Sequence, residues 1–387
     1  MNSINILERL ISFPTVSRDS NLDLISYVSE MLQKNGIQSR LVHSQDGGKA
    51  NLFATVGPQD CPGVVLSGHT DVVPVEGQDW TFPFFEMTRR DGRLYGRGTA
   101  DMKGFVACAL AAMIKASTQQ LRTPLHLALS YDEEIGCIGV RRLIETLQLS
   151  LYKPLLCIVG EPTNMQVATG HKGKIAARAI CRGLEGHSAL APLALNAIHL
   201  ACDFVAALRK EQDRLEHEGP HDRDYEVPYT TIHAGKINGG VVLNIVPNLC
   251  QVDFEIRAVA QDDADAILQT LRAEADRIVK QAAARTPEAT IQIDVLNRYP
   301  GLDTSPSSES VAFVKSLIGA NGTIKVAFGT EGGLFNRDLE APTVICGPGS
   351  MEQGHKPDEY VTVEQMQRCD MMLDRLLNKL TRAALLG

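Results

Sequence analysis

Residues 64–71 of the chain read VVLSGHTD, an apolar segment that runs directly into a histidine and an aspartate. The apolar part, Val64–Ser67, has the length and composition of a buried β-strand. In open sheets of parallel strands joined by helices, ligands bind beyond the carboxyl ends of the strands. His69 and Asp71 stand at such an end, and being two residues apart they point the same way while the chain stays extended. The segment therefore predicts a strand of an α/β sheet and polar side chains placed at its binding edge.

The sequence on either side of this segment alternates between extended and helical patterns. Short apolar strands are expected at Leu52–Val56, Leu125–Ser130 and Leu155–Val159, with helices at 103–116 and 140–147. Strands that alternate with helices of this length are typical of an α/β domain. We therefore predict a mostly parallel sheet flanked by helices.

The pattern changes after residue 174. The next elements follow the order strand, helix, strand, strand, helix, strand, and are expected at 175–181, 193–215, 229–237, 251–258, 263–284 and 290–296. This is the split βαβ order of a ferredoxin-like α+β domain. The signals of an α/β domain resume after Pro300 and end in an amphipathic helix that begins at Val363. We predict one α/β domain in two parts, 1–174 and 299–387, interrupted by an inserted domain at 175–298.

Composition excludes several classes of function. The 387 residues include 46 acidic and 38 basic side chains, a net charge of −8 that argues against a partner made of nucleic acid or anionic membrane. No apolar run approaches the ~20 residues of a membrane span, and Glu8 and Arg9 interrupt the apolar N-terminal stretch, so no signal peptide is expected. Nine scattered cysteines without a C-x-x-C pair predict reduced thiols, a cytoplasmic location and no cysteine-ligated zinc.

Several other polar residues follow predicted strands or begin a predicted helix. Asp101 precedes the helix at 103–116, the acidic run 132–134 and Glu161 each follow a strand, and His355 lies in a polar loop. Each has an ordinary explanation by itself, such as a helix N-cap for Asp101 or a solvated loop for His355. Taken together with His69, they match a site for two metal ions built from carboxylates and imidazoles. Such ligands, without thiolates, suit zinc, cobalt or manganese.

These motifs resemble, in the same order, those of the dizinc deacylases and peptidases of the acetylornithine deacetylase/succinyl-diaminopimelate desuccinylase type. The matching segments are SGHTDVVP (67–74), GRGTADMKG (96–104), DEEIG (132–136), Glu161 and His355. The resemblance covers nearly the whole chain. It implies a zinc-exopeptidase-like catalytic domain with an inserted domain that acts as a lid and as the interface of a homodimer.

The resemblance also implies five metal ligands. His69 and Glu161 would bind one zinc ion, Glu134 and His355 would bind the other, and Asp101 would bridge the two. Cobalt is expected to be able to replace zinc. Two ions held together by a carboxylate can polarise a carbonyl group and generate hydroxide from water.

Further residues take roles in catalysis or substrate binding by the same resemblance. Asp71 would orient His69, and Glu133 would be the general base that takes a proton from water and returns it to the leaving amine. His187, in the segment GHSA (186–189), would reach the active site of the other subunit and stabilise the oxyanion. Asn244 and Arg257 would contact the substrate, since an arginine can clamp a carboxylate with two hydrogen bonds.

The segments FGTEGG (328–333) and GHKPDEY (354–360) look like those of acetylornithine deacetylases, whereas desuccinylases typically carry Ser-Asp after Gly-Thr. The implied reaction is hydrolysis of N2-acetyl-L-ornithine to ornithine and acetate, a step of arginine biosynthesis. We place Glu331 and Gly332 among the substrate-binding residues, with the hypothesis that Glu331 neutralises the side-chain ammonium group of the substrate.

Other functions remain open at this point. An acetylcitrulline deacetylase or a broader N-acyl-amino-acid amidohydrolase comes next, followed by a desuccinylase or a dipeptidase. A non-catalytic, metal-stabilised binding protein is an alternative of another class, although the presence of Glu133 and a complete ligand set argues against it. A phosphate-binding transferase is disfavoured because the sequence has no Walker-type loop.

Overall fold

The structure is a computed structural model that describes residues 2–149, 152–283 and 286–382. The chain divides into two compact units, Met1–His171 with Leu302–Gly387 (unit 1) and Lys172–Gly301 (unit 2). The sequence predicts the boundaries after residues 174 and 298, whereas they lie after residues 171 and 301. The difference arises because the first and last strands of unit 2 are longer than their apolar cores suggest.

Unit 1 is built on a nine-stranded sheet. Its strands follow the order β1 (Ser39–His43), β2 (Ala50–Val56), β6 (Leu125–Ser130), β3 (Val64–His69), β7 (Leu156–Pro162), β17 (Thr343–Gly347), β8 (Ala168–His171) and β15 (Leu302–Asp303), with β16 (Ile324–Val326) beside β8. The central strands β6, β3, β7 and β17 run parallel to one another. The predicted fold class, a mostly parallel sheet flanked by helices, is confirmed.

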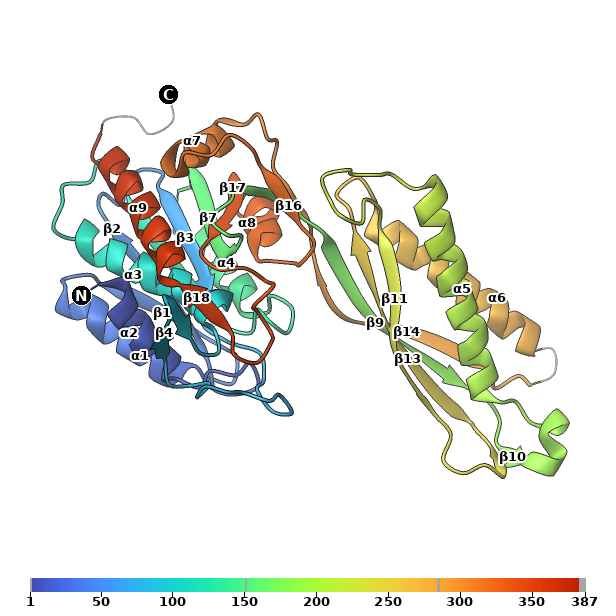
Figure 1. The fold of residues 1–387 in the computed structure, drawn as a ribbon. Helices are drawn as coiled ribbons and strands as arrows, with labels where there is room; N and C mark the ends of the chain where they lie inside the picture. Colours follow the sequence, from blue (N-terminus) through green and yellow to red (C-terminus); the bar gives the residue numbers. More distant parts are fainter. Residues whose placement is uncertain (1, 150–151, 284–285, 383–387) are drawn as a thin grey trace. The chain divides into compact units, whose positions relative to one another are not determined.

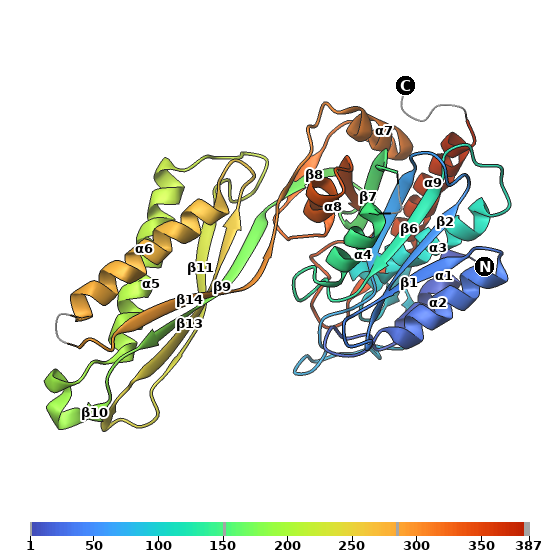
Figure 2. The ribbon, with the colours of Figure 1, turned by 180° about the vertical axis from the view of Figure 1, so that it is seen from behind.

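Helices cover both faces of this sheet (Figures 1 and 2). One face carries α3 (Gly104–Ala116) and α9 (Val363–Leu380), which share a core with α1 (Ser3–Ile11), α2 (Leu22–Lys34) and α7 (Glu309–Ile318). The other face carries α4 (Gly139–Gln148) and α8 (Gly332–Asp338). Strand β7 passes so close to α3 that a Cβ atom at Gly160 would lie 1.8 Å from the Phe105 ring. Glycine is therefore required at residue 160, immediately before the predicted ligand Glu161.

A small three-stranded sheet also belongs to unit 1. Its strands follow the order β18 (Tyr360–Thr362), β5 (Arg93–Tyr95) and β4 (Thr88–Arg90). Strand β5 leads into the segment that carries Asp101, and β18 follows the loop that carries His355. Pairing of these two strands brings together two segments that are far apart in the sequence.

Unit 2 is a four-stranded antiparallel sheet with two helices packed on one face. Its strands follow the order β11 (Thr231–Gly239), β13 (Leu249–Ala258), β9 (Gly173–Arg182) and β14 (Thr290–Tyr299), and its helices are α5 (Ala197–Glu218) and α6 (Ala264–Ala283). This is the predicted split βαβ arrangement. The strand expected at 229–237 is β11, which continues to Gly239 because Gly239 still pairs with Cys250. The chain then forms β12 (Ile245–Val246), which pairs with β10 (Gly186–His187).

All nine cysteines lie in the described part of the chain, and all are free thiols. Most of them are buried and pack as small apolar side chains. Among the described residues, no helix combines the length and the apolar character that crossing a membrane requires.

Candidate metal centre

Three of the predicted site residues meet at one edge of the sheet in unit 1. His69 is the last residue of β3, Glu161 lies near the end of β7, and Glu133 follows the end of β6. Because β6, β3 and β7 are parallel neighbours, their carboxyl ends lie side by side. All three side chains are buried, and His69 is only 1% exposed. The topology of the sheet thus gathers residues that are up to 92 positions apart (69 to 161).

Asp101 lies in the irregular turn Thr99–Lys103 that precedes α3, and the Asp101–Met102 peptide bond is cis. Glu359 fixes this turn, because its Oε1 accepts hydrogen bonds from the backbone N–H groups of Ala100 (2.9 Å) and Asp101 (3.1 Å). Its Oε2 accepts a hydrogen bond from Arg97 at 2.7 Å, and both of these side chains are buried. The backbone of Asp101 is therefore held by a buried ion pair. Sequence reasoning gave no role to Arg97 or Glu359, although both lie in the motifs quoted above.

Asp101 lies between two histidines. Its Oδ1 is 3.1 Å from Nε2 of His69, and its Oδ2 is 3.2 Å from Nε2 of His355. Each histidine has a second carboxylate beside it, since Glu161 lies 3.8 Å from His69 and Glu134 lies 3.0 Å from His355. The structure thus brings together all five residues that the resemblance implies as ligands.

Four of these five residues, together with Glu133, form two clusters with metal-binding geometry in the described part of the chain. One cluster comprises His69, Glu133 and Glu161, and the other comprises His69, Asp101 and Glu134. Within each cluster the potential ligand atoms lie within 4.8 Å of one another. Glu133 therefore lies beside the ligand set, where a base could reach a water molecule bound there.

Asp71 acts through both its backbone and its side chain. His69 Nδ1 lies 2.9 Å from the backbone carbonyl oxygen of Asp71 and 3.6 Å from its carboxylate. Since a carbonyl only accepts, Nδ1 carries the proton and Nε2 is free to bind a metal. The carboxylate of Asp71 instead accepts hydrogen bonds from the backbone N–H groups of Glu133 (3.1 Å) and Glu134 (3.2 Å). The backbone of Asp71 therefore orients His69, while its carboxylate holds the turn that carries the two glutamates.

Two residues without a predicted role support this turn from outside. Ser17 Oγ donates a hydrogen bond of 2.7 Å to the Asp71 carboxylate, and Lys49 Nζ donates to both the Ser17 carbonyl and the Asp132 carboxylate. Asp132 has a left-handed φ of 55°. Only the folded structure shows these contacts, because no local pattern links Ser17 or Lys49 to residue 132.

Burial and crowding shift the pKa values of the site. Burial raises the pKa of Glu133 and Glu161 well above the usual range, and it raises the pKa of Glu134 to about 7. Burial also acts to raise the pKa of Asp101, but hydrogen bonds from the two histidines hold that pKa below its usual value. Hydrogen bonds to Asp101 and Glu134 raise the pKa of His355 to about 10. The buried carboxylates thus call for positive charge, which divalent cations would supply.

The predicted lid residues lie in unit 2 and differ in their surroundings. His187 and Asn244 are exposed and adjacent, since His187 in β10 pairs with Ile245 in β12. Arg257, in β13, is already engaged, because its guanidinium donates to both carboxylate oxygens of Glu255 (3.1 and 3.3 Å) and to the Tyr299 hydroxyl (3.0 Å). A substrate carboxylate would have to compete with Glu255 for it.

Glu331 and Gly332 lie at the start of α8 and are buried. Glu331 is only 1% exposed, its Oε2 accepts a hydrogen bond from Ser67 at 3.3 Å, and burial raises its pKa to about 7. Its Oε1 has no hydrogen-bond partner within the described ranges. This enclosed position differs from our expectation of a residue that meets the ammonium group of a substrate.

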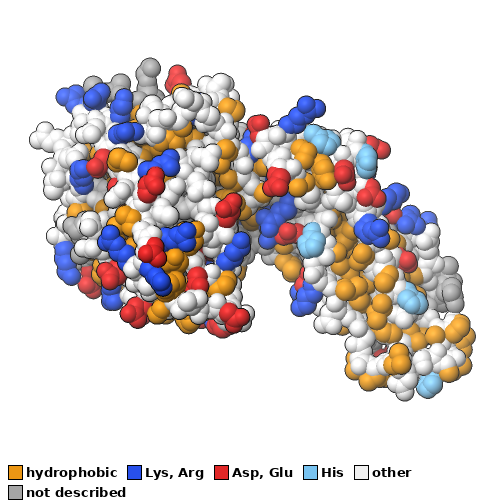
Figure 3. Space-filling model, in the orientation of Figure 1, with side chains coloured by type: hydrophobic (Ala, Val, Ile, Leu, Met, Phe, Trp, Pro, Cys, Tyr) orange, Lys and Arg blue, Asp and Glu red, His pale blue; other side chains and the backbone are white. Residues whose placement is uncertain are grey.

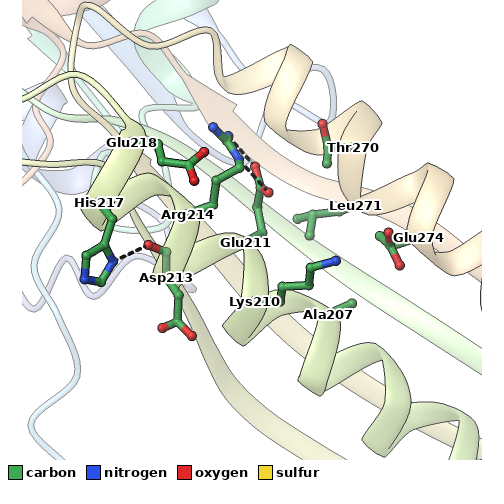
Figure 4. A pocket seen from close by; sticks show the side chains of 10 residues that line it. All are labelled: Ala207, Lys210, Glu211, Asp213, Arg214, His217, Glu218, Thr270, Leu271 and Glu274. Atoms are coloured by element: carbon green, nitrogen blue, oxygen red, sulfur yellow. Dashed lines mark hydrogen bonds and ion pairs between the residues drawn. The ribbon is translucent and has the colours of Figure 1, made fainter.

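A hollow of about 580 Å³ lies between α5 and α6 in unit 2 (Figure 4). Polar groups along it pair within α5, as Figure 4 shows: Arg214 binds Glu211 at 2.6 Å, and His217 Nδ1 lies 2.7 Å from the Asp213 carbonyl. Neither metal-binding cluster of the described residues lies here. Both metal-binding clusters found among the described residues lie in unit 1.

The chain is similar to known proteins in both sequence and structure. The model of Peptidase family M20/M25/M40 matches residues 65–379. An acetylornithine deacetylase of Myxococcus xanthus is 34% identical over 380 residues (95% of each chain), and one of Shigella sonnei (strain Ss046) is 34% identical over 370 residues (92% of each chain). An M20 family metallo-carboxypeptidase of Sulfolobus solfataricus has a similar structure, with a TM-score of 0.79 and 18% identity over 97% of this chain and 98% of that chain.

Proposed function

The chain belongs to peptidase family M20/M25/M40 and is a metal-dependent amidohydrolase, and from this premise we propose that it deacetylates N2-acetyl-L-ornithine in arginine biosynthesis. The resemblance drawn from the motifs is thereby confirmed. Support for the substrate comes from the two relatives that carry the name acetylornithine deacetylase over nearly the full length of both chains. The nine free thiols support our further proposal that the reaction takes place in the reducing cytoplasm.

The position of Asp101 between two histidines is the observation that carries a site for two ions. Each of its oxygens faces a different imidazole, so one carboxylate would bridge an ion held by His69 and Glu161 and an ion held by His355 and Glu134. Glu134 Oε1 is buried and lacks a hydrogen-bond partner among the described residues, as a ligand atom would. Imidazole and carboxylate ligands without thiolate fit zinc, which we propose as the metal, with cobalt as a substitute.

When bound, the ions would polarise the scissile carbonyl group and make an attacking water molecule more acidic. Glu133 would take the proton of that water molecule as the oxygen forms its bond to the carbonyl carbon. As the C–N bond breaks, Glu133 would pass the proton to the amine nitrogen, so that ornithine and acetate leave. Asp71 would keep Glu133 in place through the backbone hydrogen bond described above.

We propose that unit 2 forms a homodimer and that His187 of a second copy stabilises the oxyanion of the transition state. Strand β11 lies at the edge of its sheet and is mostly exposed, so its backbone is available for pairing with another strand. The segment 241–245 beside it is also exposed and mostly apolar. Both features are typical of a surface that is covered in an assembly.

The decisive experiment is a panel of acyl amino acids assayed with the chelated enzyme after it has been reloaded with zinc or with cobalt. We expect the highest kcat/KM for N2-acetyl-L-ornithine, ahead of N2-acetylcitrulline, N-acetylmethionine and N-succinyl-diaminopimelate. A higher kcat/KM for another member of the panel would replace the proposed substrate. Absence of hydrolysis with either metal, in protein that binds metal, would contradict the proposed reaction.

A further inference from the structure

The side chain of Cys137 faces the carboxylate of Glu133. Its Sγ lies 3.3 Å from Glu133 Oε1, and the thiol is only 1% exposed. The backbone N–H groups of Gly136 (2.7 Å) and Cys137 (2.8 Å) both donate to the carbonyl oxygen of Glu133, which closes the turn between them. The backbone of this turn thus holds the thiol against one specific oxygen of the carboxylate.

Cys137 keeps its proton in this position. Burial raises the pKa of the thiol well above its usual value, and the nearby charges of Glu133 and Glu331 raise it further. The group is therefore S–H, and a carboxylate oxygen 3.3 Å away is its acceptor.

The backbone makes a side chain at this position costly. Cys137 has a φ of 55°, in the left-handed region that glycine adopts without strain and other residues rarely adopt. A glycine would therefore suit the turn better than a cysteine does. The Cys137 side chain nevertheless donates a hydrogen bond to Glu133, so it does more than fill space in the core.

We propose that Cys137 is a positioning residue for the hydrolysis, in which its S–H fixes Oε1 of Glu133 and leaves Oε2 for proton transfer. The inference rests on the proposed role of Glu133 as the general base. It adds a residue that acts on the base through a contact of its own, separate from the metal ligands. Other buried thiols have different partners, as Cys346 shows by contacting Met372 Sδ at 3.8 Å.

The test compares Cys137→Ser with Cys137→Gly in the metal-loaded enzyme. Serine keeps a donor of similar size, whereas glycine removes the donor and relieves the strained φ, so a loss of activity in Cys137→Gly cannot be ascribed to backbone strain. We expect kcat to fall about tenfold in Cys137→Gly, the scale of one hydrogen bond to a charged group. We expect KM and metal content to stay within twofold of the wild type, and Cys137→Ser to recover most of the lost kcat. Cys61→Gly and Cys61→Ser, at a half-buried thiol elsewhere in unit 1, serve as matched controls.

A double-mutant cycle that combines Cys137→Gly with Glu133→Asp shows whether Cys137 acts through Glu133. The shorter aspartate withdraws its carboxylate from the thiol, so Cys137→Gly should cost little further kcat in that background. An unchanged kcat in Cys137→Gly, an equal loss in Cys137→Ser, or an undiminished loss in the Glu133→Asp background would each overturn the proposal. Full activity of Glu133→Gln would instead refute the role of Glu133 as general base. This outcome is independent of the results for the Cys137 variants, so the two proposals can fail separately.

Discussion

The two units of the molecule treat charged and apolar side chains in opposite ways. Unit 1 buries a histidine and four clustered carboxylates, Asp101 among them, although ionised groups are costly to remove from water. Unit 2 instead exposes apolar side chains, with Val241 and Leu243 at 95% and 100% exposure, and Figure 3 shows orange side chains gathered at the end that carries β10. Buried carboxylates are stabilised by a nearby cation, and exposed apolar side chains are stabilised when another surface covers them. The difference agrees with our proposal that unit 1 carries the reacting groups and unit 2 the surface for assembly.

The strongest test of this division is the loss of the base in unit 1. Glu133→Gln removes the proton acceptor but leaves the five ligands in place, so we expect kcat to fall by roughly 10²–10⁴-fold. Metal content, measured by elemental analysis, should remain at the wild-type value. Loss of metal in this variant would show that Glu133 is a ligand rather than the base, a possibility raised by its place in a cluster with His69 and Glu161.

The next test asks whether unit 2 takes part in the chemistry. His187→Ala removes the proposed oxyanion donor, and we expect a fall in kcat of roughly 10²–10³-fold with little change in metal content. Mixed dimers of His187→Ala and Glu133→Gln subunits should regain activity, since one active site would then have both groups intact. No recovery in verified mixed dimers would mean that His187 does not act in a second copy. His217→Ala, a change on α5 in the same unit, is the control.

The apolar segment of unit 2 gives a third test. Leu243→Asp places a charge on the most exposed leucine of the segment, and we expect it to weaken self-association by roughly 100-fold, as for a central interface residue. Sedimentation over a range of concentrations measures this change. Leu149→Asp is the matched control, because Leu149 is 91% exposed in unit 1 and should leave association unchanged. A wild-type chain that stays monomeric at all concentrations would contradict a dimer through unit 2.

Sequence patterns predicted the central strands well because buried parallel strands are nearly continuous apolar runs. The strand predicted at Leu125–Ser130 has the same limits as β6. The strand expected to end at residue 237 continues to Gly239 because Asn238 and Gly239 still pair with β13, a tertiary effect that local sequence patterns do not contain. The helix expected from Leu193 begins at Ala197 instead, because Asn196 caps it and Ser188–Leu193 forms a separate 3-10 turn.

In the candidate site, too, local sequence patterns did not predict the tertiary contacts. Its proposed ligands could be found from the sequence because each lies in a short motif at the end of a strand or the start of a helix. The residues that hold them could not be found in this way: Glu359 binds the backbone of Asp101 from 258 positions away, and Lys49 reaches Asp132 across 83 positions. Such contacts depend on the register of the whole sheet. Spacing within a motif carries no information about them.

The smallest expected effect concerns Glu331, a buried carboxylate of unit 1 to which we assign no role as a metal ligand. Burial raises its pKa to about 7 in the folded chain, from an ordinary value of 4.5. Between pH 4.5 and about pH 7, the folded state binds more protons than the unfolded state. Ionisation of Glu331 therefore lowers the free energy of unfolding as the pH rises. Glu331→Gln cannot ionise and escapes this loss. In metal-free protein, its stability relative to the wild type should therefore increase by about 2 kcal/mol from pH 5 to pH 8.

Urea unfolding of both proteins at pH 5 and pH 8 measures this difference. Glu340→Gln, at a side chain that is 75% exposed, should show no comparable dependence on pH. In metal-loaded protein the effect should shrink, because nearby cations favour the ionised form of Glu331. An effect of the same size with and without metal would show that bound ions do not change the pKa of Glu331, and that burial and the hydrogen bond from Ser67 determine it without them. A KM that rises more for acetylornithine than for acetylmethionine in Glu331→Gln would instead restore a contact with the ammonium group of the substrate.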